Sequence, residues 1–112
     1  MDPRNVNMII NSLLKVASSA PTLSGSTPYF QQYPFNQSNV RSDVSKAEFD
    51  AWIQYVNQTL DISQKYMNWS IFTQEKIKIS QTSLNEGIPY IQRIRMIQQM
   101  LLDLAQQLNN YN

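Results

Sequence analysis

The sequence has 112 residues, a formal net charge of +1 and only 15% charged side chains. It contains no cysteine and no histidine, which excludes disulfides, Cys/His zinc sites, cysteine nucleophiles and imidazole bases. The small net charge argues against strong electrostatic attraction to nucleic acid or to an acidic membrane surface. Because the eight acidic residues are scattered along the chain, we predict that the protein is not an enzyme and uses no metal or cofactor.

Uncharged polar residues take the place of charged ones, since Asn and Gln make up about a fifth of the sequence. Side-chain amides both donate and accept hydrogen bonds, which suits a surface that lies against other protein. No run reaches the roughly 18 apolar residues needed to span a bilayer. We therefore expect one soluble domain, intracellular or within a virus or phage particle, whose partners are proteins.

The N-terminal stretch, residues 1–20, predicts an amphipathic helix. Asp2 can accept from free backbone N–H groups, and Pro3 suits the first helical position because it loses no hydrogen bond there. The apolar face, widened by its last two members, comprises Val6, Ile9, Ile10, Leu13, Val16, Ala17, Ala20, Met8 and Leu14. The opposite side lacks the lysines of a membrane-surface helix, so we expect this helix to pack on protein and to end before Pro21.

Residues 21–44 differ in character from the stretch before them. Three prolines, one glycine and clusters of Ser and Thr argue against regular structure. The segment nevertheless carries four aromatic side chains, Tyr29, Phe30, Tyr33 and Phe35. Purely solvated linkers are poor in aromatic residues, so these rings should be covered, either by the protein's own helices or by a neighbouring subunit. We interpret the segment as an extended arm whose four rings are interface residues.

A second helix is predicted to begin after Ser45. Ser45 and Glu48 form a capping box, in which each side chain can satisfy the other residue's backbone N–H. Apolar side chains then recur at helical spacing and broaden into a wide face: Phe49, Trp52, Ile53, Tyr55, Val56, Leu60, Ile62, Tyr66 and Met67. Trp52 and Trp69 are predicted as core or interface anchors, because each indole buries a large area.

Two stretches govern how residues 45–112 divide into helices. Through residues 68–73 two alternatives stay open: one continuous helix, or a break after which Thr73 caps a new helix. At residues 85–89 a break or sharp kink is expected, since the final proline removes a helical hydrogen bond. The region should form a helical hairpin or bundle.

The clearest pattern lies in the last 23 residues or so, after Pro89. Apolar residues alternate at spacings of four and three: Tyr90, Ile94, Ile97, Leu101, Leu104, Leu108 and Tyr111. An α-helix turns once in about 3.6 residues, so this repeat keeps one apolar stripe facing one way and requires a partner helix. The partner helix can belong to the same chain or to another chain.

Four basic residues of the C-terminal half are the candidates for a nucleic-acid contact: Lys76, Lys78, Arg93 and Arg95. Residues two apart on a helix point to different faces. We therefore interpret all four as parts of solvated faces and do not expect a nucleic-acid partner.

Together these patterns predict an all-α fold: a short N-terminal helix, an irregular aromatic arm, and two or three longer helices with heptad-type packing. The predicted function is that of a structural or assembly protein, a small helical subunit of a larger complex such as a virus or phage particle. The alternative is a helical adaptor or regulator that binds a single protein partner. Besides the arm, the predicted interface residues are Trp52, Trp69, Ile94, Ile97, Leu101, Leu104 and Leu108.

The capping box can be tested directly. Ser45→Ala should lower the free energy of unfolding by about 1 kcal/mol, the usual loss when an N-cap side chain is removed. Urea denaturation followed by circular dichroism measures the change. An unchanged unfolding midpoint would place the start of the helix elsewhere, for example at Asp43.

Overall fold

The computed structural model describes residues 3–23 and 42–111. Within these ranges the chain forms four α-helices and no strand. The helices are α1 (Pro3–Ser18), α2 (Lys46–Tyr66), α3 (Ser70–Ser83) and α4 (Tyr90–Tyr111). The predicted all-α class is therefore confirmed.

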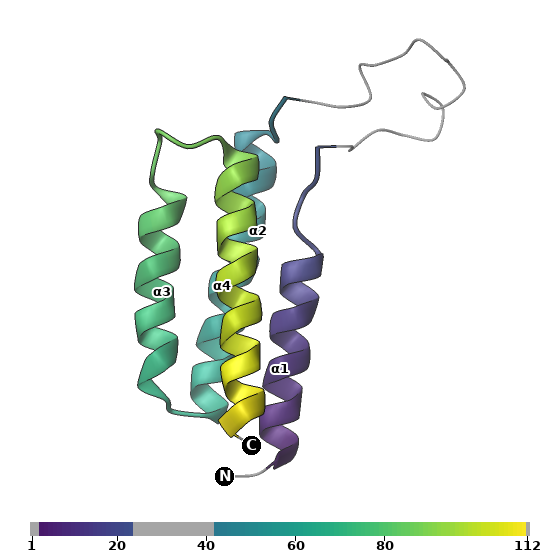
Figure 1. Ribbon diagram of the computed structural model, residues 1–112, viewed down its shortest axis with the longest axis vertical. Helices are drawn as coiled ribbons and strands as arrows, with labels where there is room; N and C mark the ends of the chain where they lie inside the picture. Colours follow the sequence, from purple (N-terminus) through teal and green to yellow (C-terminus); the bar gives the residue numbers. More distant parts are fainter. Residues whose placement is uncertain (1–2, 24–41, 112) are drawn as a thin grey trace, which may run out of the picture.

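The four helices pack as an up-down-up-down bundle (Figure 1). Helices α1 and α3 run in one direction, whereas α2 and α4 run in the other. Both α2 and α4 pack against α1 and α3, and the most extensive contact is that between α1 and α4. As a result, the start of α1 and the end of α4 lie at the same end of the bundle.

Helix α1 begins at Pro3 and ends at Ser18, within the stretch that the sequence predicted. At its C-terminal end the hydroxyl of Ser18 donates to the Lys15 carbonyl at 3.0 Å, and the hydroxyl of Ser19 donates to the Val16 carbonyl at 2.9 Å. Both carbonyl groups also accept from the backbone N–H of Ser19, at 3.1 and 3.3 Å, so the two hydroxyls add further bonds to the last turn of the helix. The chain then leaves the helical conformation before it reaches Pro21.

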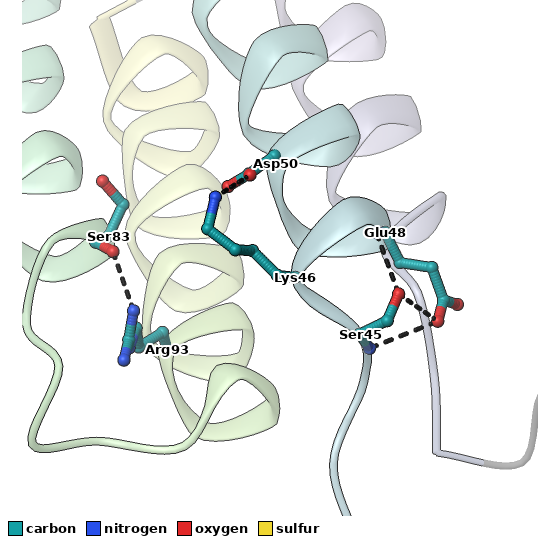
Figure 2. A network of polar contacts seen from close by, with 6 residues as sticks. All are labelled: Ser45, Lys46, Glu48, Asp50, Ser83 and Arg93. Atoms are coloured by element: carbon teal, nitrogen blue, oxygen red, sulfur yellow. Dashed lines mark hydrogen bonds and ion pairs between the residues drawn. The ribbon is translucent and has the colours of Figure 1, made fainter.

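Helix α2 starts at the predicted capping box (Figure 2). The backbone N–H of Glu48 donates to Ser45 Oγ at 3.1 Å, and the backbone N–H of Ser45 donates to Glu48 Oε1 at 3.3 Å. Within the first turn and a half of α2, an exposed ion pair joins Lys46 Nζ and Asp50 Oδ2 at 2.6 Å. This pair adds little stability, because exposed i,i+4 pairs contribute only about 0.3–0.5 kcal/mol.

The structure decides between the alternatives for residues 68–73 in favour of a break, but at an earlier position than Thr73. Helix α2 ends at Tyr66, and α3 begins at Ser70. Trp69 occupies the N-cap position of α3, and its side chain makes no capping hydrogen bond. Thr73 lies inside α3, where its Oγ1 accepts a 2.9 Å hydrogen bond from Gln64 Nε2 of α2. The alternative in which Thr73 caps the new helix is therefore wrong in its position. The break expected at residues 85–89 is confirmed between α3 and α4.

One continuous apolar core fills the bundle, and α4 contributes its central stripe. Each of the other three helices lays its own apolar face on the same core: Val6, Ile9, Leu13 and Val16 of α1, Phe49, Trp52, Val56 and Leu60 of α2, and Phe72 and Ile79 of α3. The stripe of α4 is at most 1% exposed at five positions, Ile94, Ile97, Leu101, Leu104 and Leu108. The helices that cover this stripe come from the same chain.

Leu101 lies at the centre of this stripe, so truncation of its side chain tests the core. Leu101→Ala should lower the free energy of unfolding by about 2–5 kcal/mol, through lost apolar burial and the cavity left behind. Because the covering helices belong to the same chain, the loss should be independent of protein concentration. Leu102→Ala is the matched control, since Leu102 is 42% exposed and should change stability by at most about 0.5 kcal/mol. Thermal unfolding of both variants and of the wild type at several concentrations measures these losses, and a Leu101→Ala loss that shrinks as the concentration rises would contradict the intramolecular core.

Candidate functional site

The predicted interface residues fall into three groups. Four lie outside the described residues: Tyr29, Phe30, Tyr33 and Phe35. Trp69 is partly buried. The other six are buried among the chain's own helices: Trp52, Ile94, Ile97, Leu101, Leu104 and Leu108. A neighbouring chain can touch these six only if the bundle opens or exchanges helices, so their role at a subunit contact stays a prediction.

Two side chains from other helices hold the C-terminal end of α1. The indole N–H of Trp52, on α2, donates to the Val16 carbonyl at 2.8 Å. The side-chain amide of Gln98, on α4, donates to the Ala17 carbonyl at 2.8 Å. The last carbonyl groups of a helix lack helical partners, so these bonds fix the end of α1 to both of its neighbours. Trp52 is buried in the core of its own chain, which is one of the two alternatives, core or interface, that the sequence left open for it.

A carboxylate just before α2 caps the first turn of α4. Asp43 Oδ2 accepts from the backbone N–H of Tyr90 at 3.0 Å, and Oδ1 accepts from the backbone N–H of Ile91 at 2.8 Å. Oδ1 also accepts from the backbone N–H of Val44 at 2.9 Å. The first N–H groups of a helix lack helical partners and favour a negative charge. Asp43 therefore joins two helix starts that are more than 40 residues apart in sequence.

Arg93 fastens the turn between α3 and α4. Its Nε donates to the Ile88 carbonyl at 2.6 Å and its Nη1 donates to the Ser83 carbonyl at 3.0 Å, the latter bond drawn in Figure 2. The guanidinium carbon lies 4.7 Å from the centre of the Tyr90 ring and 5.7 Å from that of Phe49. Because Arg93 is only 6% exposed, the interpretation of this residue as part of a solvated face is wrong.

Two more of the four basic candidates lie on α3, and both form ion pairs with acidic side chains. Lys76 forms an ion pair with Asp61 of α2, and Lys78 lies 3.3 Å from the buried carboxylate of Glu75. The Lys76–Asp61 pair joins α3 to α2, whereas the Lys78–Glu75 pair lies within α3. Among the described residues, no group of three or more His, Cys, Asp or Glu side chains lies close enough to hold a metal ion.

The environment of Asp43 shifts the pKa of its carboxyl group. Partial burial acts to raise the pKa, but the hydrogen bonds from the backbone N–H groups of Ile91, Tyr90 and Val44 lower it, and so does the positive charge of Arg93. The net effect is a pKa below the ordinary value of 3.8. The fold therefore stabilises the ionised form of the cap.

An apolar groove lies between α1 and α2, with a volume of about 300 Å³. Three large apolar side chains line it while remaining accessible: Met8 is 43% exposed, Ile62 is 54% exposed and Tyr66 is 55% exposed. Tyr55 lines the same groove and is partly buried. We call these four residues and the surface between them the α1–α2 groove. Clustered exposed apolar side chains in a concave surface are typical of binding sites.

The polar groups of the α1–α2 groove are turned back onto their own helices. The hydroxyl of Ser12 donates to the Met8 carbonyl at 2.9 Å. Those of Thr59 and Ser63, on α2, donate to carbonyls one turn earlier at 2.9 and 2.7 Å. Lys15 is the charged residue that lines the groove. The groove is therefore more apolar in character than the types of its residues suggest.

A second groove, with a volume of about 450 Å³, lies on the other side of α1, against α4. It is lined by Leu14 and Leu102, which are both exposed, and by Arg95 and two glutamines. One of these, Gln99, donates to Asp103, one turn further along α4, at 2.9 Å. This groove offers a smaller apolar area than the α1–α2 groove does.

The sequence did not identify these grooves, because it placed their residues on core faces. Met8 and Leu14 were expected to widen the apolar face of the first helix, and Ile62 and Tyr66 that of the second. In the structure these four residues lie at the edges of those faces, where none of the described helices covers them. Helical spacing gives the direction of a side chain, but it does not give the width of the surface that a neighbouring helix covers.

Comparison with known proteins gives no relative from which to infer a function. A scan against protein-family models, a search of curated proteins and a search of solved structures each return no match. Among the described helices, none combines the length and the apolar character needed to cross a membrane.

The Asp43 cap predicts an acid-dependent loss of stability. Asp43→Asn should lower the free energy of unfolding by about 0.3–1 kcal/mol at pH 7, because asparagine lacks the negative charge that the N-terminus of α4 favours. Because the fold lowers the pKa of Asp43 below 3.8, the stabilisation is present above that value and is lost as the pH falls through the lower, folded-state pKa. The two proteins should therefore converge in stability at acid pH.

Denaturation of both proteins between pH 7 and pH 2.5 measures this difference. Asp50→Asn serves as the control, because Asp50 forms an exposed pair with Lys46, and such a pair should contribute about 0.5 kcal/mol or less. A difference between wild type and Asp43→Asn that is the same at both ends of the pH range would show that the charge of the cap is unimportant.

Proposed function

We propose that the protein is a non-catalytic structural subunit of a larger protein complex, such as a virus or phage particle. It contacts neighbouring proteins through exposed surfaces of its helices and through the segment 21–44. The observation that carries this proposal is the α1–α2 groove, where three large apolar side chains stay exposed next to a completed core.

Exposed apolar residues are common on protein surfaces when they are scattered singly. Here Met8, Ile62 and Tyr66 line the same concave surface, and such clusters mark protein contacts more often than scattered residues do. The amide-rich, weakly charged composition supports the same proposal, because protein interfaces are depleted in charged residues at their centres. These features favour binding to protein over binding to nucleic acid.

The segment 21–44 provides the second proposed contact. Its four aromatic residues, predicted from the sequence to be interface residues, fall between Leu23, which follows α1, and Ser42 before the start of α2. The end of α1 and the start of α2 lie at the same end of the bundle (Figure 1). A segment that connects two helix ends at the same end of the bundle suits the proposed role of an arm that reaches a neighbour.

The alternative is a helical adaptor or regulator that binds one protein partner. The observation that favours it is the burial of the α4 stripe by helices of the same chain. A bundle that is complete as a single chain does not require an oligomer for its stability. In this alternative, the exposed grooves serve one partner rather than several neighbouring subunits.

The mass of the purified protein in solution tests the proposal. Sedimentation velocity across a concentration series should give a defined oligomer if the protein is an assembly subunit. Replacement of the four aromatic residues of the arm with serine should shift this oligomer toward monomer at unchanged helix content, measured by circular dichroism. A protein that stays monomeric at every concentration would contradict self-assembly and favour the adaptor.

A further inference from the structure

We propose that the α1–α2 groove binds an amphipathic helix of another protein, one that carries carboxylates beside its apolar face. This inference rests on the proposed function only in that the protein binds other proteins. It does not depend on self-assembly or on the arm. Three properties of the groove support it: its length, its hydrogen-bonding groups and its charge.

The length of the groove matches about three turns of a helix. On the α1 side it runs from Met8 to Lys15, and on the α2 side from Tyr55 to Tyr66. At a rise of about 1.5 Å per residue, these stretches span roughly 10 Å and 16 Å. An amphipathic helix that places anchors at positions i, i+3 or i+4, and i+7 covers a similar distance. The four apolar residues of the groove can receive such a row of anchors.

The hydrogen-bonding groups of the groove favour a helix over an extended peptide. An extended peptide needs partners for its backbone N–H and C=O groups, as in strand addition to a sheet edge. Both walls of the groove are helices, and the hydroxyls of Ser12, Thr59 and Ser63 already donate to carbonyls of those helices. A helix satisfies its own backbone groups and needs only apolar contact from the groove.

The charge of the groove favours an acidic partner. Lys15 is the charged residue in its lining, and the exposed Lys65 lies one turn beyond Ile62 on the same side of α2. The acidic residues of α2 are engaged elsewhere: Asp61 with Lys76 of α3, Asp50 with Lys46, and Glu48 in the capping box. Carboxylates that flank the apolar face of a partner helix would therefore meet lysines at the rim.

The same charges disfavour a second copy of this chain in a symmetric groove-to-groove contact. A two-fold interface brings the same patch of both copies together. The lysines of one groove would then face the lysines of the other, and none of the described residues that line the groove is acidic to compensate. Like charges juxtaposed across an interface are costly, so a different protein with acidic residues is the better occupant.

A displayed peptide library tests the proposal and needs no candidate partner. The probe is a yeast-displayed library of helical peptides of about 14 residues, randomised on one face and its flanks. Selection against the full-length protein should enrich peptides with apolar residues at i, i+3 or i+4, and i+7, and with net negative charge. Ile62→Asp should weaken binding of the enriched peptides by about tenfold or more, because it places a charge among the apolar anchors.

Matched controls separate the groove from general surface effects. Ile77 of α3 is 54% exposed, like Ile62, but lies outside the groove, so Ile77→Asp should leave binding unchanged. Lys15→Glu should shift the enrichment toward basic peptides. Arg95→Glu reverses a charge in the other groove and should not cause this shift. Thermal unfolding of each variant verifies that the bundle remains folded.

Several results would overturn the inference. One is that the wild-type protein enriches no more peptides than the Ile62→Asp variant does. Another is that the wild-type protein enriches neutral or basic peptides. Conversion of an oligomer to monomer by Ile62→Asp would identify a second copy as the occupant. Ile62-dependent binding to vesicles of phosphatidylglycerol would identify a membrane instead. A protein that still forms oligomers but selects no peptide would leave the proposed assembly function standing while refuting this occupant.

Discussion

The burial of the apolar stripe of α4 is the constraint on which the rest of the fold depends. Five of its side chains are at most 1% exposed, and α1 packs against α4 more extensively than any other pair of helices. Helix α1 is therefore held between α4 and α2, and a groove remains on each side of it. The surfaces available to a partner follow from the requirement that α1 cover the stripe.

Polar contacts at the helix ends fix the position in which the apolar faces meet. Trp52 and Gln98 hold the last turn of α1, and Asp43 and Arg93 hold the start of α4. Apolar packing alone tolerates sliding, because its energy is nearly non-directional. Hydrogen bonds to unpaired groups at helix ends are directional and short in range. They position α1 and thereby determine which side chains line the α1–α2 groove.

The sequence by itself determined the features that depend on neighbours within about one helical turn. Pro3, the Ser45–Glu48 box and Pro89 set helix boundaries through backbone hydrogen bonding, and the structure places helix ends beside each of them. The spacing of apolar residues likewise indicated which side of α4 is buried. Such local rules failed at residues 68–73, where Trp69 occupies the start of α3 without a side-chain cap.

Only the tertiary structure decided which helices cover which faces. Ile62 and Tyr66 have the same spacing as core residues of α2, yet they are exposed because none of the described helices lies over that edge. Asp43 and Arg93 gave no local signal of their roles, because Asp43 finds its partners on α4, more than 40 residues away, and Arg93 needs the turn between two helices to close around it. Periodicity fixes the direction of each side chain along one helix, whereas exposure, capping between helices and the grooves depend on the placement of a second helix, which the local spacing does not encode.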